Sequence, residues 1–554
     1  MSPTLSPPKN YQPVFCSEVE RLQNVVRRQQ EQISVQQQII DTLEQQLKRQ
    51  GERIEQLEAE LRAQKKLKGK PKIRASRLNE SKTESAEGEE KKRPGSGKRS
   101  KKLGFGCYEE KIIQPEEIPE NAKFNGYRDY DVQELTLECQ HIRFRLAEYI
   151  TEAGNTIVGE LPSEYRYGHY GPLLVGYILY QHYQCRVTQP LLHEQLSEWG
   201  VEISKGQLHS LLCEHKASFH TEQQQVLKVG IETARYIQTD DTGARHQGKN
   251  GYCTVIGNQW FTYFRSSDRK SRQSFLETLQ GESRLYVLNE YAHDYLNSYG
   301  LPVKDWEKLT FSAQVLAREQ SEWSVYLKDL GIVGKQVSRL VTEAALLGGA
   351  IEQGVDIHLQ ILSDGAPQFN VLVHALCWIH AERALRRLSG ETPQQTQNIE
   401  QMQQLLWEYY QQLKVYQQNP DIALKLQLEQ DFDQLFGRCF LNHSDLNKVL
   451  NQFRARKDEL LRMLDCPQLP LHNNGSESDI REYVTLRKVS GGTRSEAGRR
   501  ARDTFLGLKK TCRKLGISFW RFLISRLRGD GQIPPLPDLI RSLSSTPPLE
   551  SIPT

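Results

Sequence analysis

Three short acidic segments, far apart in the sequence, constrain the fold of this chain most strongly. Asp240 ends a β-branched run shortly before a glycine, and Asp364 follows an apolar run and directly precedes Gly365. Both patterns are typical of a strand that ends in a turn. Glu477 follows a stretch of Asn and Ser and lies on the first turn of an expected helix. We therefore expect these carboxylates to meet, as hard oxygen ligands suited to Mg²⁺ or Mn²⁺.

The residues around these segments predict an α/β core made of a mixed sheet with flanking helices. Three consecutive antiparallel strands are expected, followed by a fourth strand that ends before Asp364; these strands are residues 234–239, 251–257, 260–265 and 357–362. Helical inserts are expected near residues 281–350 and 393–465. This order is that of a ribonuclease H-like core, in which the first and fourth strands are neighbours. Asp240 and Asp364 would then lie side by side.

The N-terminal residues 1–64 carry a heptad pattern. From Val19 to Leu61 apolar residues alternate at spacings of three and four without a slip. β-branched residues at one seam position and Leu at the other favour a parallel dimer, although Gln residues and Gly51 weaken the seam. We expect a coiled coil that makes a homodimer or a higher oligomer. A lone helix packed on its own protein is the alternative.

Residues 65–104 form a basic segment. They contain 15 Lys or Arg against 5 Glu, an excess of +10, so the net charge of +4 leaves −6 for the rest of the chain. Few large apolar side chains are present, and we expect a disordered linker. It is either suited to contact with DNA phosphates or simply solvated. The Pro- and Ser-rich tail at 529–554 is also expected to be disordered.

Residues 105–232 are expected to form a helical DNA-binding region. Near residues 189–212 a helix, a Gly turn and a second helix capped by Ser204 match a helix-turn-helix. Lys205 and Gln207 would begin its recognition helix. The alternative interpretation of the same sequence is an ordinary pair of antiparallel helices.

A second basic stretch follows Glu477. Its cations are expected to follow a DNA backbone and are Arg487, Lys488, Arg494, Arg499 and Arg500. A solvated basic helix face is the alternative. The ten cysteines contain no Cys-x-x-Cys pair, and there is no signal peptide or membrane span, so we expect a soluble intracellular protein.

Four blocks in a fixed order carry a family resemblance: residues 240–245, 362–365, 377–383 and 472–477. Together they resemble the DDE transposases and, more narrowly, the large transposase of the insertion sequence sixty-six family, over about residues 171–522. The resemblance implies a catalytic domain at 233–528 with Asp240, Asp364 and Glu477 as catalytic residues and metal ligands. The family usually reads Asp-Glu-Thr at the first segment, whereas this chain reads Asp240-Asp241-Thr242. Asp241 is therefore a rival of Asp240.

The resemblance also implies a function. Two Mg²⁺ or Mn²⁺ ions would support cleavage at the terminal repeats of a DNA element and strand transfer into target DNA, in a bacterial cytoplasmic protein at the nucleoid. Helper proteins from the same element are expected partners, and no zinc and no membrane are expected. Supporting residues near the carboxylates are His380, Arg383, His472 and Arg481, which would orient a phosphate or pair with the acids. The alternative is a decayed or domesticated transposase that acts as a dimeric DNA-binding regulator.

Overall fold

The computed structural model describes residues 135–545 except positions 166 and 167, together with Val26, Gln29 and parts of 111–127. Apart from Val26 and Gln29, which are helical, the predicted coiled coil at 1–64 and the linker at 65–104 lie outside the described residues. The chain separates into two units, Met1–Ala75 and Ser76–Thr554, and the following paragraphs concern the second. Within its described part, no helix is long and apolar enough to cross a membrane.

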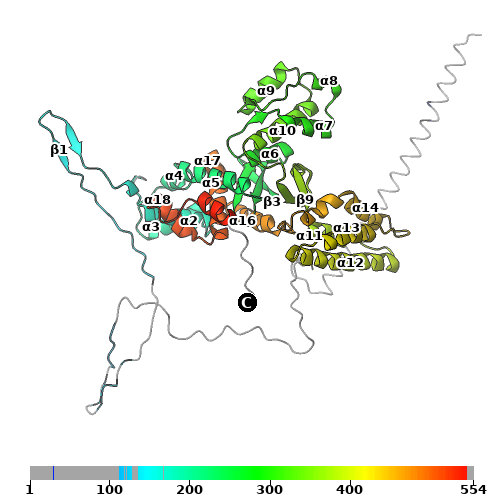
Figure 1. Ribbon diagram of the computed structural model, residues 1–554. Coiled ribbons are helices and arrows are strands. Elements are labelled where there is room, and N and C mark those ends of the chain that lie inside the picture. Colours follow the sequence, from blue (N-terminus) through cyan, green and yellow to red (C-terminus); the bar gives the residue numbers. More distant parts are fainter. Residues whose placement is uncertain are drawn as a thin grey trace, which may run out of the picture. The chain divides into compact units, whose positions relative to one another are not determined.

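A five-stranded mixed sheet forms the core of this unit (Figure 1). Its strands are β3 (Tyr236–His246), β4 (Lys249–Gly257), β5 (Thr262–Ser267), β8 (Gln360–Ser363) and β9 (Val373–Leu376). The spatial order is β5-β4-β3-β8-β9. β3, β4 and β5 pair antiparallel, while β8 runs parallel to both β3 and β9. The predicted antiparallel triplet and the predicted contact between the first and fourth strands are thus confirmed.

The two faces of β3 belong to different apolar cores, because successive side chains of a strand point to opposite sides. Helices around the sheet are α6 (Arg272–Gln280), α10 (Lys335–Glu352), α11 (Trp378–Arg386), α16 (Asn474–Ser490) and α17 (Glu496–Lys514). Ile237 shares a core with Phe275 of α6. Ala244 instead packs with Ile480 and Leu486 of α16. Even-numbered residues of β3 therefore face α16, and odd-numbered residues face α6.

Helix α17 covers the free edge of β5. The backbone N–H of Thr262 donates to Thr511 Oγ1 (3.1 Å), and that of Ser266 donates to Asp503 Oδ2 (2.6 Å). Burial raises the pKa of the Asp503 carboxyl to about 6. Side chains of a helix thus satisfy edge donors that another strand would otherwise pair with, which protects the sheet from edge-to-edge association.

In the described part of the region before the sheet, residues 105–232, α-helices occur only from Pro172 onward. It contains α2 (Pro172–Tyr183), α3 (Gln189–Glu198), α4 (Lys205–Cys213) and α5 (Ala217–Glu232). Ser204 caps α4 as predicted, in a reciprocal capping box with Gln207. The helical prediction is wrong before α2, where β1 (Glu148–Ile150) and β2 (Thr156–Val158) pair as a hairpin. β-branched residues on both sides of Gly154, which has φ +80°, favour a hairpin over a helix.

The two predicted inserts contain most of the remaining helices. The first consists of β6 (Tyr286–Val287), α7 (Glu290–Ser298), α8 (Val303–Trp306), β7 (Val315–Ala317), α9 (Gln320–Asp329) and α10. It is not purely helical, since β6 and β7 form a small antiparallel sheet. The second consists of α12 (Pro393–Gln418), α13 (Ile422–Phe436), α14 (Ser444–Ala455) and α15 (Lys457–Leu460). Figure 1 shows α12, α13 and α14 beside α11.

The prediction of a disordered tail is wrong for its described part. After α18 (Phe519–Arg528), residues Leu536–Ser545 form α19. Leu536 and Ile540 are fully buried, and α19 packs on α5. The backbone N–H of Leu536 also donates to Glu222 Oε1 (3.0 Å). The Pro and Ser content of this stretch led to the prediction of disorder, although its apolar residues recur at the spacing of an amphipathic helix.

Candidate active site

Asp240 lies on the central strand β3 and faces α16. Its Oδ1 accepts a hydrogen bond from the Asp241 backbone N–H (2.8 Å). Burial raises the pKa of Asp240 to about 7; the negative charges of Asp364, Asp241 and Glu477 add to this effect, and the Asp241 hydrogen bond opposes it. Three chain segments more than a hundred residues apart thus bring carboxylates within electrostatic reach of one another.

Asp364 directly follows β8 and is exposed. Its Oδ1 accepts from the backbone N–H of Ala366 (2.9 Å), across a turn in which Gly365 has φ +94°. This turn rests on buried polar contacts: Ser363 Oγ lies 2.8 Å from His374 Nε2, and His374 Nδ1 lies 2.9 Å from Glu459 Oε2. The strand end that carries Asp364 is therefore held by β9 and α15.

Glu477 lies on the first turn of α16, which is fastened to β3. Asn473 Nδ2 donates to the Thr239 carbonyl (2.8 Å), and the Ser476 backbone N–H donates to Gln238 Oε1 (3.2 Å). A Cβ at Gly475 would collide with the same Gln238 amide, so a larger residue there would force that amide to move. Gln238 and Asn473 position Glu477 beside Asp240, and the sequence patterns did not reveal this role.

Asp241 points to the opposite face. Its Oδ1 lies 2.8 Å from Lys270 Nζ, and its Oδ2 accepts from Gln368 Nε2 (2.7 Å). Both carboxylate oxygens of Asp241 are engaged, whereas the described contacts of Asp240 are limited to the neighbouring backbone N–H. Sequence reasoning missed Lys270 and Gln368, since neither belongs to a recognisable local pattern.

Glu477 faces cations rather than other acids. Its Oε1 lies 3.6 Å from Arg383 Nη1 and 3.9 Å from His380 Nε2, and its Oε2 lies 3.9 Å from Arg481 Nη2. Glu477 Oε1 is buried without a hydrogen-bond partner, as are His380 Nδ1 and His472 Nδ1. Burial lowers the pKa of both histidines. The structure brings three of the four predicted supporting residues to Glu477 within about one ion-pair distance.

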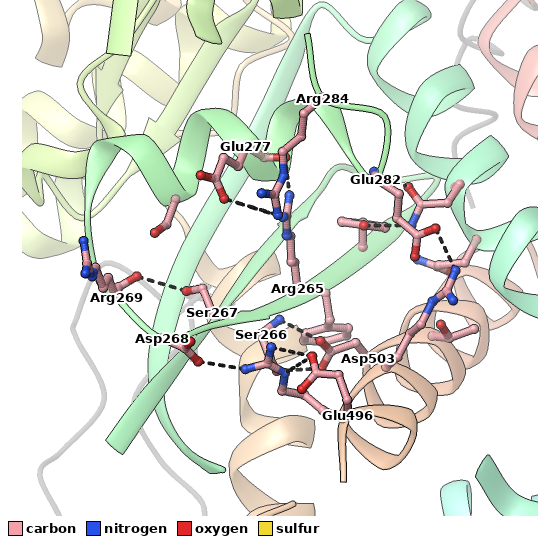
Figure 2. Close-up of a pocket in the computed structure, with 18 of the residues that line it drawn as sticks. Arg265, Ser266, Ser267, Asp268, Arg269, Glu277, Glu282, Arg284, Glu496 and Asp503 are labelled. Carbon is pink, nitrogen blue, oxygen red and sulfur yellow. Dashed lines mark hydrogen bonds and ion pairs between the residues drawn. The ribbon is translucent and has the colours of Figure 1, made fainter. Parts of the chain in front are cut away.

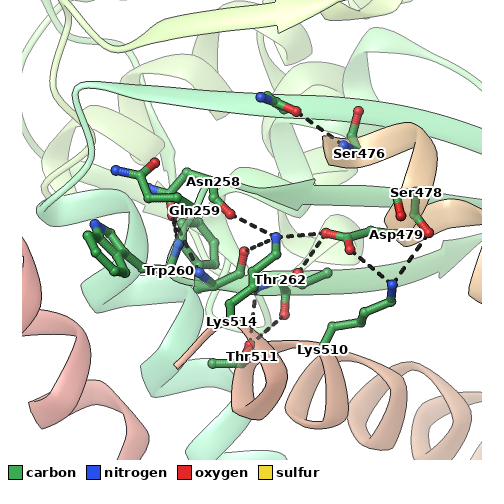
Figure 3. Close-up of polar contacts among 12 residues, drawn as sticks. Asn258, Gln259, Trp260, Thr262, Ser476, Ser478, Asp479, Lys510, Thr511 and Lys514 are labelled. Atoms are coloured by element: carbon green, nitrogen blue, oxygen red, sulfur yellow. Dashed lines mark hydrogen bonds and ion pairs between the residues drawn. The ribbon is translucent and has the colours of Figure 1, made fainter. Parts of the chain in front are cut away.

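Buried ion pairs hold α16 on α17 (Figure 3). Asp479 lies 2.7 Å from Lys514 Nζ and 3.3 Å from Lys510 Nζ, and its Oδ2 also accepts from Thr262 Oγ1 (2.8 Å). One turn later Glu482 lies 2.8 Å from Arg186 Nη2 and 3.0 Å from Lys509 Nζ.

Glu482 shows the strength of this anchoring. Burial on its own would raise its pKa, but the Arg186 hydrogen bond and the charges of Lys509 and Lys510 outweigh burial and lower the pKa to about 2. Ionic contacts between distant segments thus add to the apolar packing of Ile480 and Leu486 in fixing α16.

The three carboxylates have the chemistry of ligands for a divalent cation. In the described part of the chain, no group of three His, Cys, Asp or Glu side chains is close enough to hold a metal ion. Glu477 nevertheless has a buried oxygen without a hydrogen bond, and the charged form of Asp240 is disfavoured. Carboxylate oxygens are the ligands Mg²⁺ prefers, and a cation here would offset the repulsion.

The other cations predicted to bind DNA fall into two groups. Lys205, Lys488 and Arg494 are exposed, and Arg487 Nη1 lies 3.5 Å from the position a Cβ would take on Gly243 of β3. Gln207 is exposed as well, although its Oε1 accepts from the Ser204 backbone N–H (2.9 Å). These side chains are available to a ligand.

Arg499 and Arg500 belong to the second group. Arg499 pairs with Asp268 (2.9 Å) and Arg500 with Glu282 (2.7 Å), at the wall of a cavity of about 730 Å³ beside β5. Figure 2 shows that acids such as Glu277 and Glu496 accompany the basic residues of this cavity. Its positive charges are largely neutralised within the protein.

Comparison with known proteins identifies the class as a transposase. The sequence model of the transposase IS66 family matches residues 362–501, a range that contains Asp364 and Glu477 but not Asp240. An uncharacterized protein, y4jO of Sinorhizobium fredii strain NGR234, is 42% identical over 324 residues, which is 57% of this chain and 99% of the relative. The chain belongs to the IS66 family of transposases.

Proposed function

We propose that this protein cleaves DNA at the ends of an insertion sequence and transfers the freed strand into target DNA. The fold carries the proposal: β3 with Asp240 pairs with β8, which Asp364 follows, and the start of the helix that bears Glu477 is hydrogen-bonded to β3. Family membership supports it independently, because two of the three carboxylates lie in the matched range. The strand order, with an antiparallel triplet followed by two parallel strands, supports a ribonuclease H-like core.

Asp240, Asp364 and Glu477 would hold two Mg²⁺ or Mn²⁺ ions. Such ions activate a water or a 3′-hydroxyl and stabilise the leaving oxygen of a phosphodiester. We assign the first ligand to Asp240 rather than Asp241. Asp240 shares the α16 face of β3 with Gln238, and Asp241 is already bound through both oxygens.

The residues around the carboxylates would act by orientation and charge. Asn473 and Gln238 keep the start of α16 on β3, so Glu477 stays beside Asp240. The Arg383–Glu477 contact, at 3.6 Å, is too long for a strong hydrogen bond. Turning Glu477 toward Asp240 would free the Arg383 guanidinium to bind a DNA phosphate, for which its planar fork is suited. No covalent bond between protein and DNA is required.

The remaining surfaces would recognise DNA. Helices α3 and α4, which residues 199–204 connect, would form the helix-turn-helix, with Lys205 at the start of α4 as a phosphate or base contact. Arg487, Lys488 and Arg494 would follow the backbone next to the carboxylates. Dimerisation through residues 1–64 would bring two such DNA-binding regions together, one for each end of the element. Helper proteins from the same element would be further partners.

A donor-to-target transfer assay tests this function. The DNA flanking the gene is offered with Mg²⁺ to the wild-type protein and to Glu477→Gln. New junctions with the wild type alone are expected. Junctions formed equally by both proteins would remove Glu477 from the catalytic set, and end binding without junctions from either protein would contradict the proposed catalysis.

A second candidate is a DNA-binding regulator derived from a transposase that no longer cuts. One observation favours it: Glu477 lies among Arg383, His380 and Arg481, and the carboxylates of the described chain are not grouped as a ligand set. Mg²⁺ distinguishes the two candidates. It raises the melting midpoint of a protein that binds it in the folded state, and an unchanged midpoint would favour the regulator.

A further inference from the structure

Lys270 is a cation of the acidic centre that no sequence pattern identifies. It lies in the loop between β5 and α6, one residue before Ser271, whose hydroxyl caps α6 by accepting the Ser274 backbone N–H. Its Nζ lies 2.8 Å from Asp241 Oδ1. The β5 strand end and the helix cap on either side restrict where this short loop can place the lysine.

Asp241 is organised to hold this lysine. Its second oxygen is taken by Gln368 Nε2 (2.7 Å), and its side chain is only 7% exposed. Because both oxygens of this nearly buried carboxylate are hydrogen-bonded, it holds the lysine ammonium beside it in a defined position. The Lys270 side chain itself is 42% exposed, so an incoming ligand can reach it.

Lys270 is linked to two segments of the proposed catalytic centre through Asp241. Asp241 directly follows Asp240 on β3, and Gln368, which donates to the same carboxylate, lies four residues after Asp364. β3 pairs with β8 only over its first three residues, so the part of β3 that carries both aspartates is open toward the end of β8. Lys270 approaches from the α6 side of the sheet, because Asp241 is an odd-numbered residue of β3. Arg383 and His380 meet Glu477 from α11. Cations from two different elements thus flank the acidic centre.

We propose that Lys270 binds a non-bridging oxygen of the scissile phosphate. The inference rests on the proposed function and specifies how its substrate is held. A phosphodiester that enters a group of carboxylates meets repulsion unless fixed positive charge lies beside it, and a lysine ammonium supplies a compact point charge for one phosphate oxygen. Asp241 keeps that charge in place before DNA arrives, so little ordering is needed on binding.

The test compares two DNA duplexes and four proteins. Both duplexes span the junction between the element end and its flank; one has natural phosphates, and the other has a single uncharged methylphosphonate at the scissile linkage. The proteins are the wild type, Lys270→Met, Lys270→Arg and Lys425→Met. Lys425 of α13 is the matched control. Its side chain is 31% exposed, and its Nζ lies 2.6 Å from Asp465 Oδ1, so it forms a comparable ion pair. Affinity is measured in Ca²⁺, a hard cation with the same ligand preference.

Lys270→Met is expected to weaken binding of natural DNA by about tenfold, the typical loss of one hydrogen bond to a charged group. On the methylphosphonate duplex Lys270→Met and the wild type should bind equally, since the lysine has lost its partner. Lys270→Arg should keep part of the difference, and Lys425→Met should match the wild type. Melting midpoints of all variants show whether each protein is folded.

Two results would overturn the inference. If Lys270→Met weakens binding of both duplexes equally, Lys270 is a general DNA contact. If Lys270→Met binds natural DNA as tightly as Lys425→Met does, the Lys270–Asp241 ion pair is purely structural. The proposed function fails separately, when the wild type binds the natural duplex but does not cleave it in Mg²⁺. The comparison of affinities still assigns the lysine contact in that case.

Discussion

Gly475→Ala should displace the catalytic helix from the sheet. Gly475 is the second residue of α16, and an added Cβ would collide with Gln238 Oε1 and lie 3.1 Å from Gln238 Cδ. Gln238 is buried and accepts the Ser476 backbone N–H. The substitution must therefore push the Gln238 amide away and break the contact that fastens the helix start to β3.

The magnitude follows from three terms. Alanine gains up to about 1 kcal/mol over glycine inside a helix. Overpacking costs about 1–3 kcal/mol, and the lost hydrogen bond costs roughly 0.5–1.5 kcal/mol. We expect a net destabilisation of about 1–3 kcal/mol, seen as a melting midpoint lower by a few degrees. Cleavage should fall further, by about a hundredfold, because a catalytic group displaced by about 1 Å can lose that much.

Gly206→Ala is the matched control for this variant. Gly206 is the second residue of α4, and its Cβ would meet only Ser204 Oγ at 3.9 Å, so this protein should be as stable as the wild type or slightly more so. The double variant Gln238→Ala/Gly475→Ala should recover part of the midpoint, since the collision is gone. Should Gly475→Ala melt and cleave like Gly206→Ala, the argument that close approach positions Glu477 is refuted.

Three further predictions concern the ionic contacts. Asp479→Asn leaves Lys514 buried without its counter-charge and leaves Lys510 with only the more distant Glu482. It should cost about 3–5 kcal/mol in thermal or chemical unfolding, and a loss below about 1 kcal/mol would mean that these ion pairs do not anchor α16. Glu482 has a folded-state pKa of about 2, below its usual 4.5, so it stabilises the fold above about pH 4.5 and loses this effect as the pH falls toward 2. The midpoint difference between the wild type and Glu482→Gln should accordingly shrink from about pH 6 to about pH 3, and a difference that widens instead would contradict the assignment. Arg494→Gln should reduce the slope of log affinity against log salt concentration for element ends by about 1. Arg500→Gln removes a guanidinium that is paired with Glu282 and should leave this slope unchanged. Equal slopes for the two variants would contradict the distinction between free and paired arginines.

Sequence patterns were sufficient for the frame of the core. Asp364 and the glycine after it form a local turn signal, and the antiparallel triplet follows from short β-rich runs separated by turn residues. The adjacency of β3 and β8 came from the assumed ribonuclease H-like order, and the structure has that adjacency. These features can be predicted because each depends on residues that are neighbours in the chain or on a known strand order.

Other features could not be predicted because their partners are distant in sequence. Lys270 meets Asp241 and Gln368, and Asp479 meets Lys514, through side chains with no common periodicity. Arg499 and Arg500 looked like DNA contacts, but acids from other segments neutralise them. Long-range ion pairs leave no pattern in a local window, so a count of basic residues overstates the positive surface.

Two secondary-structure errors have a similar cause. The α19 segment was expected to be disordered because Pro and Ser dominate its composition, yet burial of Leu536 and Ile540 on α5 stabilises it. The β1–β2 hairpin was overlooked within a region judged helical as a whole. Composition averaged over a long stretch hid short elements in both places.

The most direct test of the central claim replaces Asp240 and Asp241 in turn by cysteine and measures cleavage of element ends in Mg²⁺ and in Mn²⁺. A thiolate is a poor ligand for Mg²⁺ and a better one for a softer metal. The account predicts that Asp240→Cys cleaves only in Mn²⁺, whereas Asp241→Cys keeps measurable cleavage in Mg²⁺. Full Mg²⁺-dependent cleavage by Asp240→Cys, or a switch to Mn²⁺ dependence in Asp241→Cys alone, would contradict the assignment of Asp240 as a metal-binding catalytic residue.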